Sequence, residues 1–226
     1  MKRKEPVSNS SNPVAPKVYY PAFLNLKGKK AVVIGGGKVA ERKILSLLKE
    51  GSDVKVISPY LTKRLEKEKL SGRIEHTPRQ YRKGDLESAF LVIAATDSGV
   101  INERVSKDAP CLVNVVDTPH LCNFIVPSIV NRGLLTIAVS TSGVSPGLSR
   151  SIRKELEKLY GPEFANYLKS VKVIRAKALK LIQDKKKRGE FLKAIASEKM
   201  IEMLRAKGLS RTKRVVVDLF RKAKTT

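Results

Sequence analysis

The sequence is poor in several residue types, and each shortage excludes a class of protein. Its 226 residues include 2 cysteines, 3 methionines and no tryptophan, and only 5% are aromatic. Two cysteines build neither a disulfide scaffold nor a cysteine-rich metal site, so we expect a protein of the reducing cytoplasm. Uninterrupted apolar runs stay well short of the about 20 residues that cross a bilayer. We therefore expect no membrane partner.

Acidic residues are also scarce. There are 21 Asp and Glu against 46 Lys and Arg, a net charge of +25, and from Gly161 to the end 19 basic residues face 6 acidic ones. Such an excess suits nucleic acid, an anionic membrane surface or a polyanionic small substrate, and it also fits an ordinary solvated surface. No helix-turn-helix, zinc-finger or aromatic RNA-binding signature accompanies it, so we do not expect nucleic acid as the partner.

The first 17 residues are basic, polar and proline-containing, and no apolar run follows them. This pattern is not that of a signal peptide, and it predicts a disordered extension.

Strand-like and helix-like segments then alternate. The helices are expected at 39–49, around 61–70 and at 99–107, and the strands at 31–34, 53–57, 73–76, 89–95 and 111–116. This alternation predicts a doubly wound, parallel α/β sheet with right-handed crossovers.

The alternation of strand-like and helix-like segments ends after this region. Short strands are expected at 124–126 and 134–139, followed by a small-residue loop at 141–147 and a helix at about 148–160. Residues 163–208 read as helix only, with apolar positions at helical spacing. Residues 210–226 form a basic stretch to which the pattern assigns no structure.

A glycine motif follows the first strand. Gly35, Gly37 and Ala40 fit the G-x-G-x-x-A pattern of a dinucleotide-binding unit. The first glycine permits the tight turn, the second lets a pyrophosphate approach the backbone, and the alanine keeps the helix close to the sheet. Unpaired N–H groups at the start of the helix favour an anion. Glycine turns also serve packing alone, so the motif needs support from its surroundings.

The end of the second strand lacks the acidic residue that usually binds the ribose. It reads Ile57-Ser58-Pro59-Tyr60, where Ser58 or Tyr60 could bond a ribose hydroxyl. The residues alone therefore do not choose NAD over NADP, and they leave open a related fold that binds no cofactor.

Two further strand ends carry polar residues. Thr96 and Asp97 follow a buried strand whose end lies near the nicotinamide crevice, although either residue could instead cap the next helix. Asp117 follows the fifth strand, where partial desolvation would suit it to proton transfer. The alternative for Asp117 is a turn-forming role before Pro119.

The ordered set of motifs resembles the precorrin-2 dehydrogenases, the amino-terminal module of siroheme synthases. The motifs are residues 20–26 (YPAFLNL), 35–43 (GGGKVAERK), 94–97 (AATD), 114–117 (NVVD), 122–128 (CNFIVPS) and 139–146. The resemblance implies NAD-dependent oxidation of precorrin-2 to sirohydrochlorin, in some relatives with metal insertion as well.

The resemblance also implies an organisation. We expect a homodimer whose subunit has a Rossmann-like sheet in residues 18–126, a dimerisation segment in 127–160 and an all-helical domain in 161–209, followed by a basic tail in 210–226. Residues 1–17 and the tail exceed it.

Residue roles follow by motif match. Asp117 takes the position of the proposed general acid/base, and Lys38, Val39, Pro59 and Tyr60 match cofactor-contacting positions. Thr141, with Ser142 beside it, borders the tetrapyrrole site. Because the substrate is polyanionic, Arg42, Lys43, Arg150 and Arg153 are candidates for a basic cleft. The sequence offers no dedicated metal ligands. A Rossmann-like regulatory or nucleic-acid-binding protein is the alternative.

Overall fold

The computed structural model describes residues 17–225, which form two units divided after Val126. The predicted disordered extension, residues 1–17, lies outside the described residues except for Lys17.

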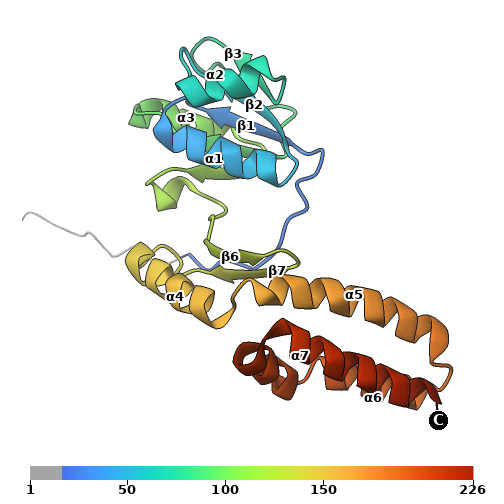
Figure 1. Cartoon of the computed structure of the whole chain (residues 1–226). Helices are drawn as coiled ribbons and strands as arrows, with labels where there is room; N and C mark the ends of the chain where they lie inside the picture. The colour runs from blue at the N-terminus through green and yellow to red at the C-terminus, as the bar shows by residue number, and fades with distance from the viewer. Residues whose placement is uncertain (1–16, 226) are drawn as a thin grey trace, which may run out of the picture. The chain divides into compact units, whose positions relative to one another are not determined.

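The first unit contains a five-stranded parallel sheet (Figure 1). Its strands are β1 (Lys30–Ile34), β2 (Asp53–Ile57), β3 (Ile74–Thr77), β4 (Leu91–Ala94) and β5 (Leu112–Val115). The order β3-β2-β1-β4-β5 confirms the predicted doubly wound sheet. The chain changes direction across the sheet between β1 and β4, and ligands of such sheets bind at that point.

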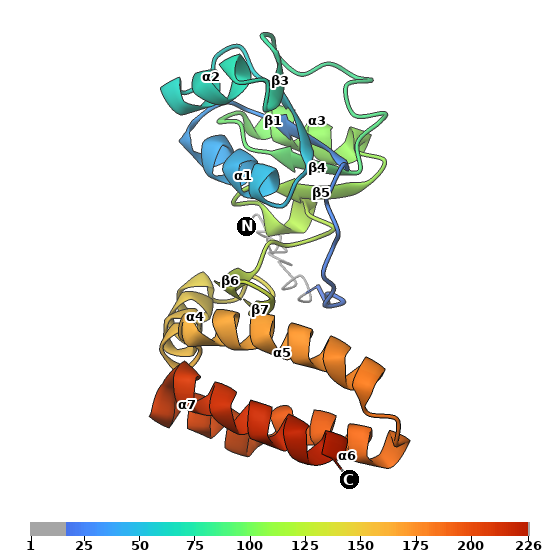
Figure 2. The same ribbon diagram turned by 45° about the vertical axis from the view of Figure 1, so that its right-hand side comes forward.

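Successive side chains of each strand point to opposite faces of the sheet, so the apolar core is divided into two clusters, one on each face. Ala31 and Val33 pack in one cluster with the helices α1 (Lys38–Lys49) and α2 (Lys63–Leu70). Val32 and Ile34 pack in the other with α3 (Gly99–Asp108). Figures 1 and 2 show α1 and α3 on opposite sides of the sheet. Both faces are buried, which explains the nearly continuous apolar strands.

Helix α1 ends where the sequence indicates. Its last residue is Lys49, Glu50 caps it, and Gly51 follows with φ 77°. A positive φ after the cap is the conformation that glycine adopts without strain, and it turns the chain toward β2.

The second unit begins with an antiparallel hairpin of β6 (Ser128–Arg132) and β7 (Leu135–Val139). The strand expected at 124–126 is wrong. Phe124 instead packs at the edge of the first unit's core, and the Asn114 side chain donates to its carbonyl. The strand lies at 128–132, in what the sequence indicated as a connection, because it pairs there with β7.

Four helices follow the hairpin. They are α4 (Pro146–Leu159), α5 (Glu163–Leu181), α6 (Lys185–Ile195) and α7 (Glu198–Thr225). The last three contact one another around Phe164, Tyr167, Phe191 and Leu204. Residues 210–225, which the sequence left unassigned, are helical, and α7 bends at Gly208, where φ is 70°.

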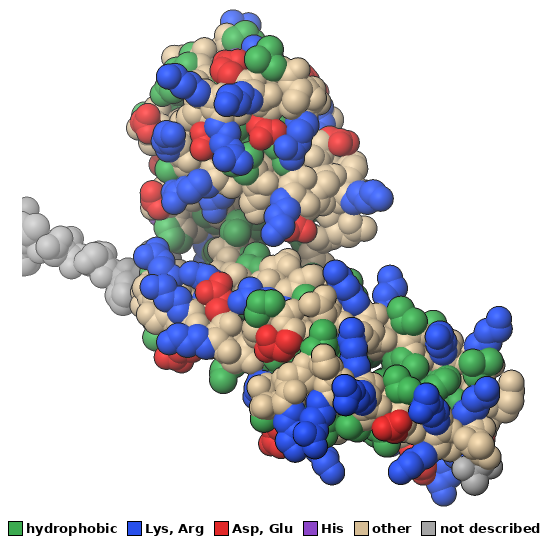
Figure 3. All heavy atoms as spheres, viewed as in Figure 1, with side chains coloured by type: hydrophobic (Ala, Val, Ile, Leu, Met, Phe, Trp, Pro, Cys, Tyr) green, Lys and Arg blue, Asp and Glu red, His purple; other side chains and the backbone are tan. Residues whose placement is uncertain are grey.

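Basic side chains cover much of this helical surface. Figure 3 shows Lys and Arg over α5, α6 and α7, with apolar side chains between them. Within residues 17–225, no helix is both long and apolar enough to span a membrane.

Candidate functional site

A cleft of about 410 Å³ lies at the carboxyl ends of β1, β2 and β4. This edge includes the point where the strand order reverses, the usual ligand position in open α/β sheets. The cleft is lined by every residue predicted to bind the cofactor, namely Gly35, Gly37, Lys38, Val39, Pro59, Tyr60, Thr96 and Asp97. Residues from three separate strand ends therefore meet in one place, while their binding roles stay predictions.

The three glycines of the turn serve different purposes. A Cβ on Gly35 would lie 2.3 Å from the Ala95 carbonyl oxygen, and a Cβ on Gly36 would lie 2.1 Å from the Tyr60 carbonyl oxygen. Both residues must be glycine because neighbouring backbone occupies the space. A Cβ on Gly37 would meet no protein atom within 4 Å. The space beside Gly37 is therefore open, which is compatible with the pyrophosphate-approach role. The sequence motif did not reveal the need at Gly36.

Helix α1 begins at Lys38, and Gly37 caps it without a side-chain hydrogen bond. The first N–H groups of a helix lack partners in the helix and, with its dipole, favour an anion. A dinucleotide pyrophosphate fits this end of the cleft, because it is anionic and Gly37 leaves it room.

The segment after β2 is held firmly. The Ser58 N–H donates to the Thr77 carbonyl at 3.2 Å, and His76 Nε2 bonds the Ser58 carbonyl at 2.9 Å. Ser58 is buried, whereas Tyr60 is 63% exposed. Among the described residues that line the cleft, Asp97 is the only carboxylate, and it follows β4 rather than β2. The ribose side of the cleft therefore offers Ser58, Tyr60 and backbone groups.

At the end of β4, Thr96 is fixed by Asn102 on α3. Thr96 Oγ1 donates to Asn102 Oδ1 at 2.8 Å, and Asn102 Nδ2 donates to the Thr96 carbonyl at 2.9 Å. The alternative that Thr96 or Asp97 caps α3 is wrong, since the Ser98 hydroxyl accepts from the Ile101 N–H. Asp97 is exposed at the cleft.

Tyr81 forms a wall of the cleft that the sequence did not predict. Its hydroxyl donates to Asp108 Oδ2 at 2.8 Å, and burial followed by this hydrogen bond raises the pKa of Tyr81. The loop before it is held by Arg79, which donates twice to the Asp85 carboxylate at 2.8 and 2.7 Å. Tyr81 lies in a connection with no periodic pattern, and only the fold brings it to the cleft.

Asp117 lies outside the residues that line this cleft, on the turn after β5. Its φ is 57°, the left-handed region, which costs a non-glycine residue about 1–3 kcal/mol. The expected partial desolvation is wrong for the described chain, because Asp117 is exposed. Within residues 17–225 its carboxylate accepts no hydrogen bond, so the side chain does not close the turn. A strained, outward-facing carboxylate is available to a ligand.

Lys43, on α1, belongs to the surroundings of Asp117. Burial lowers the pKa of the Lys43 ammonium, Arg42 lowers it further, and attraction to Asp117 raises it. The helix that starts at the glycine turn therefore brings a half-buried cation within electrostatic range of Asp117.

Thr141 and Ser142 lie in the second unit, in the loop before α4. Thr141 Oγ1 accepts from the Ser145 N–H at 3.0 Å and from Ser149 Oγ at 3.1 Å. Ser142 has φ 52°, so it and Asp117 are the non-glycine residues with positive φ in the described chain. Their substrate-binding role stays a prediction.

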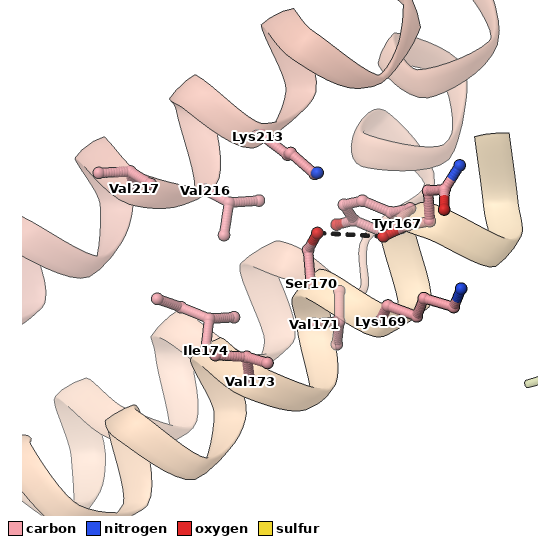
Figure 4. A pocket seen from close by; sticks show the side chains of 10 residues that line it. Tyr167, Lys169, Ser170, Val171, Val173, Ile174, Lys213, Val216 and Val217 are labelled. Carbon is pink, nitrogen blue, oxygen red and sulfur yellow. Dashed lines mark hydrogen bonds between the residues drawn. The ribbon is translucent and has the colours of Figure 1, made fainter.

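A second hollow, of about 470 Å³, lies between α5 and α7. Figure 4 shows Val173 and Ile174 on α5 across from Val216 and Val217 on α7, with Lys213 toward one end. No carboxylate, histidine or cysteine is among the described residues that line it, and its titratable side chains are Tyr167, Lys169 and Lys213. Residues 17–225 also contain no group of three or more His, Cys, Asp or Glu that could hold a metal ion.

Two family models match the chain in succession. Residues 22–128 match a model described as "Putative NAD(P)-binding", and residues 132–159 match the model "Sirohaem biosynthesis protein central". The first match covers every residue that lines the cleft.

Individual relatives agree with these models. The chain is 45% identical over 142 residues to a siroheme synthase of Methylobacillus flagellatus, covering 62% of this chain and 30% of the relative. It is 36% identical over 189 residues to that of Azotobacter vinelandii, covering 82% of this chain and 41% of the relative. The chain thus spans less than half the length of these relatives.

A solved structure of a precorrin-2 dehydrogenase superposes with a TM-score of 0.75 at 25% identity, covering 88% of this chain and all of the other. The resemblance stated from the sequence motifs is confirmed.

Proposed function

We propose that this protein, which is similar to part of the siroheme synthases, is a dehydrogenase that oxidises precorrin-2 to sirohydrochlorin with NAD. The observation that carries the proposal is the meeting of the glycine turn, the Ser58–Tyr60 segment and the Thr96–Asp97 strand end in one cleft. Similarity to the precorrin-2 dehydrogenase structure along nine-tenths of the chain supports the substrate.

Each part of NAD is assigned to a different part of the cleft. The N–H groups that open α1 would bind the pyrophosphate, with Gly37 leaving room for it. Ser58 and Tyr60 would bind a ribose, and the end of β4 with Thr96 would lie against the nicotinamide. Bound NAD supplies the hydride acceptor. NAD rather than NADP is proposed because of the resemblance, since the end of β2 offers neither a carboxylate nor an arginine.

Asp117 is proposed to hold the proton that leaves the substrate. Oxidation of a saturated tetrapyrrole carbon removes a hydride and a proton, and an exposed carboxylate free of hydrogen bonds can accept the latter. Arg42 and Lys43 would attract the substrate carboxylates from the same side.

We further propose a cytoplasmic homodimer, with residues 127–160 as the dimerisation segment and Thr141 and Ser142 in contact with the tetrapyrrole. Like the substrate, these assignments rest on the resemblance. Sedimentation of the purified protein as a monomer at micromolar concentration would contradict the dimer.

The decisive assay is anaerobic incubation of the purified protein with precorrin-2 and NAD, in which NADH formation is followed by absorbance. We expect turnover in the unsubstituted protein. In Asp117→Ala we expect turnover to fall at least about a hundredfold, as for loss of a general base, with NAD affinity unchanged. Absence of turnover in a protein that binds NAD would refute the proposed reaction. Normal turnover in Asp117→Ala would remove that residue from the mechanism.

Adding Fe²⁺ or Co²⁺ with sirohydrochlorin to the same assay tests metal insertion.

A further inference from the structure

A buried thiol lies inside the turn that carries Asp117. Cys122 is 3% exposed, and its Sγ accepts from the Val115 N–H at 3.1 Å. The same sulfur lies 3.2 Å from the Val115 carbonyl oxygen and 3.4 Å from that of Thr118, either of which can accept its S–H. This side chain therefore contacts the backbone on both sides of Asp117.

These bonds act where the backbone is strained. Asp117 has φ 57°, a conformation that persists only when its surroundings hold it. The backbone closes the turn with a single long bond between the Thr118 N–H and the Val115 carbonyl, at 3.3 Å. The Thr118 hydroxyl donates to the Val116 carbonyl at 3.2 Å, and the thiol adds contacts to Val115 and Thr118, so both side chains help to fix the direction in which Asp117 points.

The segment that carries Cys122 is anchored independently of the sulfur. The Asn123 N–H donates to the Val113 carbonyl at 3.0 Å, the Asn123 side-chain oxygen accepts from the Val113 N–H at 2.7 Å, and the side-chain nitrogen donates to the Cys111 carbonyl at 2.9 Å. From outside, Lys17 Nζ donates to the carbonyls of His120 and Cys122 at 2.8 and 2.7 Å. Removing the thiol should thus loosen the turn without detaching the segment.

We propose that Cys122 is a positioning residue for Asp117, whose thiol holds the turn in the conformation that presents the carboxylate to the substrate. This role rests on the proposed function of Asp117. It requires no reaction at the sulfur, which is buried.

The test compares Cys122→Ala and Cys122→Ser with the unsubstituted protein in the precorrin-2 assay. We expect kcat to fall roughly 10- to 100-fold in Cys122→Ala, the size of effect that a small misplacement of a reacting group produces. The Kd for NAD, measured by calorimetry, should stay within about twofold, because the thiol lies outside the cofactor cleft. Cys122→Ser should recover part of kcat, since a hydroxyl can make the same bonds but reaches less far.

Cys111→Ala is the matched control. Its thiol is half-buried and bonds only the carbonyl of its neighbour Leu112, at 3.8 Å, so kcat should not change. A double-mutant cycle separates positioning from general weakening. Adding Cys122→Ala to Asp117→Ala should change the residual rate less than about twofold, because residues that act as a unit are not additive.

Hydrogen exchange gives a readout that does not depend on turnover. The Val115 amide, which loses its acceptor in Cys122→Ala, should exchange faster, while the amides of β1 should not. Equal kcat in Cys122→Ala, or losses that multiply fully in the double variant, would overturn the positioning role while leaving the dehydrogenase intact. A lack of turnover in the unsubstituted protein would instead overturn the dehydrogenase, and this role with it.

Discussion

Replacing Gly37 by alanine should separate cofactor binding from folding. A Cβ at this position meets no protein atom within 4 Å, and the residue's φ of −79° is open to any amino acid. The folded chain therefore accommodates the methyl group without strain. Loss of a glycine N-cap and reduced freedom of the unfolded chain oppose each other, each by under about 1 kcal/mol. We expect the free energy of unfolding to change by less than about 1 kcal/mol.

The cofactor should respond differently. Atoms in ordinary van der Waals contact with a Cβ lie 3.4–4 Å from it. The added methyl group would therefore occupy the space through which a pyrophosphate would reach the N–H groups of α1. Each lost hydrogen bond to a charged group costs about 1.5–3 kcal/mol. Losing one such bond corresponds to a Kd for NAD raised about 10- to 100-fold.

Gly35→Ala is the informative comparison. Its φ of 118° is strained for alanine, and its Cβ would lie 2.3 Å from the Ala95 carbonyl oxygen. Overpacking and backbone strain each cost about 1–3 kcal/mol, so this variant should be destabilised by roughly 3 kcal/mol or more.

Calorimetric titration with NAD and denaturant unfolding followed by circular dichroism measure both quantities. An unchanged Kd in a folded Gly37→Ala protein would refute the placement of the pyrophosphate on this turn. Equal stability of Gly35→Ala and the unsubstituted protein would refute the packing reason for the first glycine.

Two further predictions concern stability. The Tyr167 hydroxyl donates to the Ile195 carbonyl at 2.6 Å inside the helical unit, so Tyr167→Phe should cost about 1–3 kcal/mol in urea unfolding. Tyr160→Phe is its control, because that hydroxyl makes no hydrogen bond within residues 17–225, and an equal loss in both variants would contradict the assignment. The hydrogen bond from Arg79 holds the pKa of Asp85 below its ordinary value of 3.8, so this pair stabilises the fold above that pH and ceases to do so as the pH falls through the lower, folded-state pKa. Asp85→Asn should therefore be less stable than the unsubstituted protein at pH 5–8 in urea unfolding, with a difference that shrinks as the pH falls below 3.8; a difference independent of pH would count against the ion pair.

Local patterns were sufficient to predict most of the first unit. Strands buried on both faces are apolar throughout, and Gly51 stops α1 through its own backbone preference. The glycine motif predicts the place where a ligand would meet the sheet, because the conformation of a short turn depends mainly on the residues within it. The prediction of a strand at 124–126 was wrong because Phe124 packs against the core without belonging to a strand. An apolar residue alone does not show whether its backbone pairs with another strand.

The sequence by itself determined the parallel sheet, its glycine turn and the polar residues at the strand ends, because these follow from short-range periodicity and from turns between neighbouring residues. Only the tertiary structure decided that Tyr81 lines the cleft, and that residue 36 must be glycine because the Tyr60 carbonyl occupies the space of a Cβ. It also decided that Ser98 rather than Thr96 caps α3. It also brought Lys43 near Asp117 and put the Cys122 thiol inside that residue's turn. Such contacts join residues far apart in the chain or depend on side-chain direction, and no local pattern encodes them.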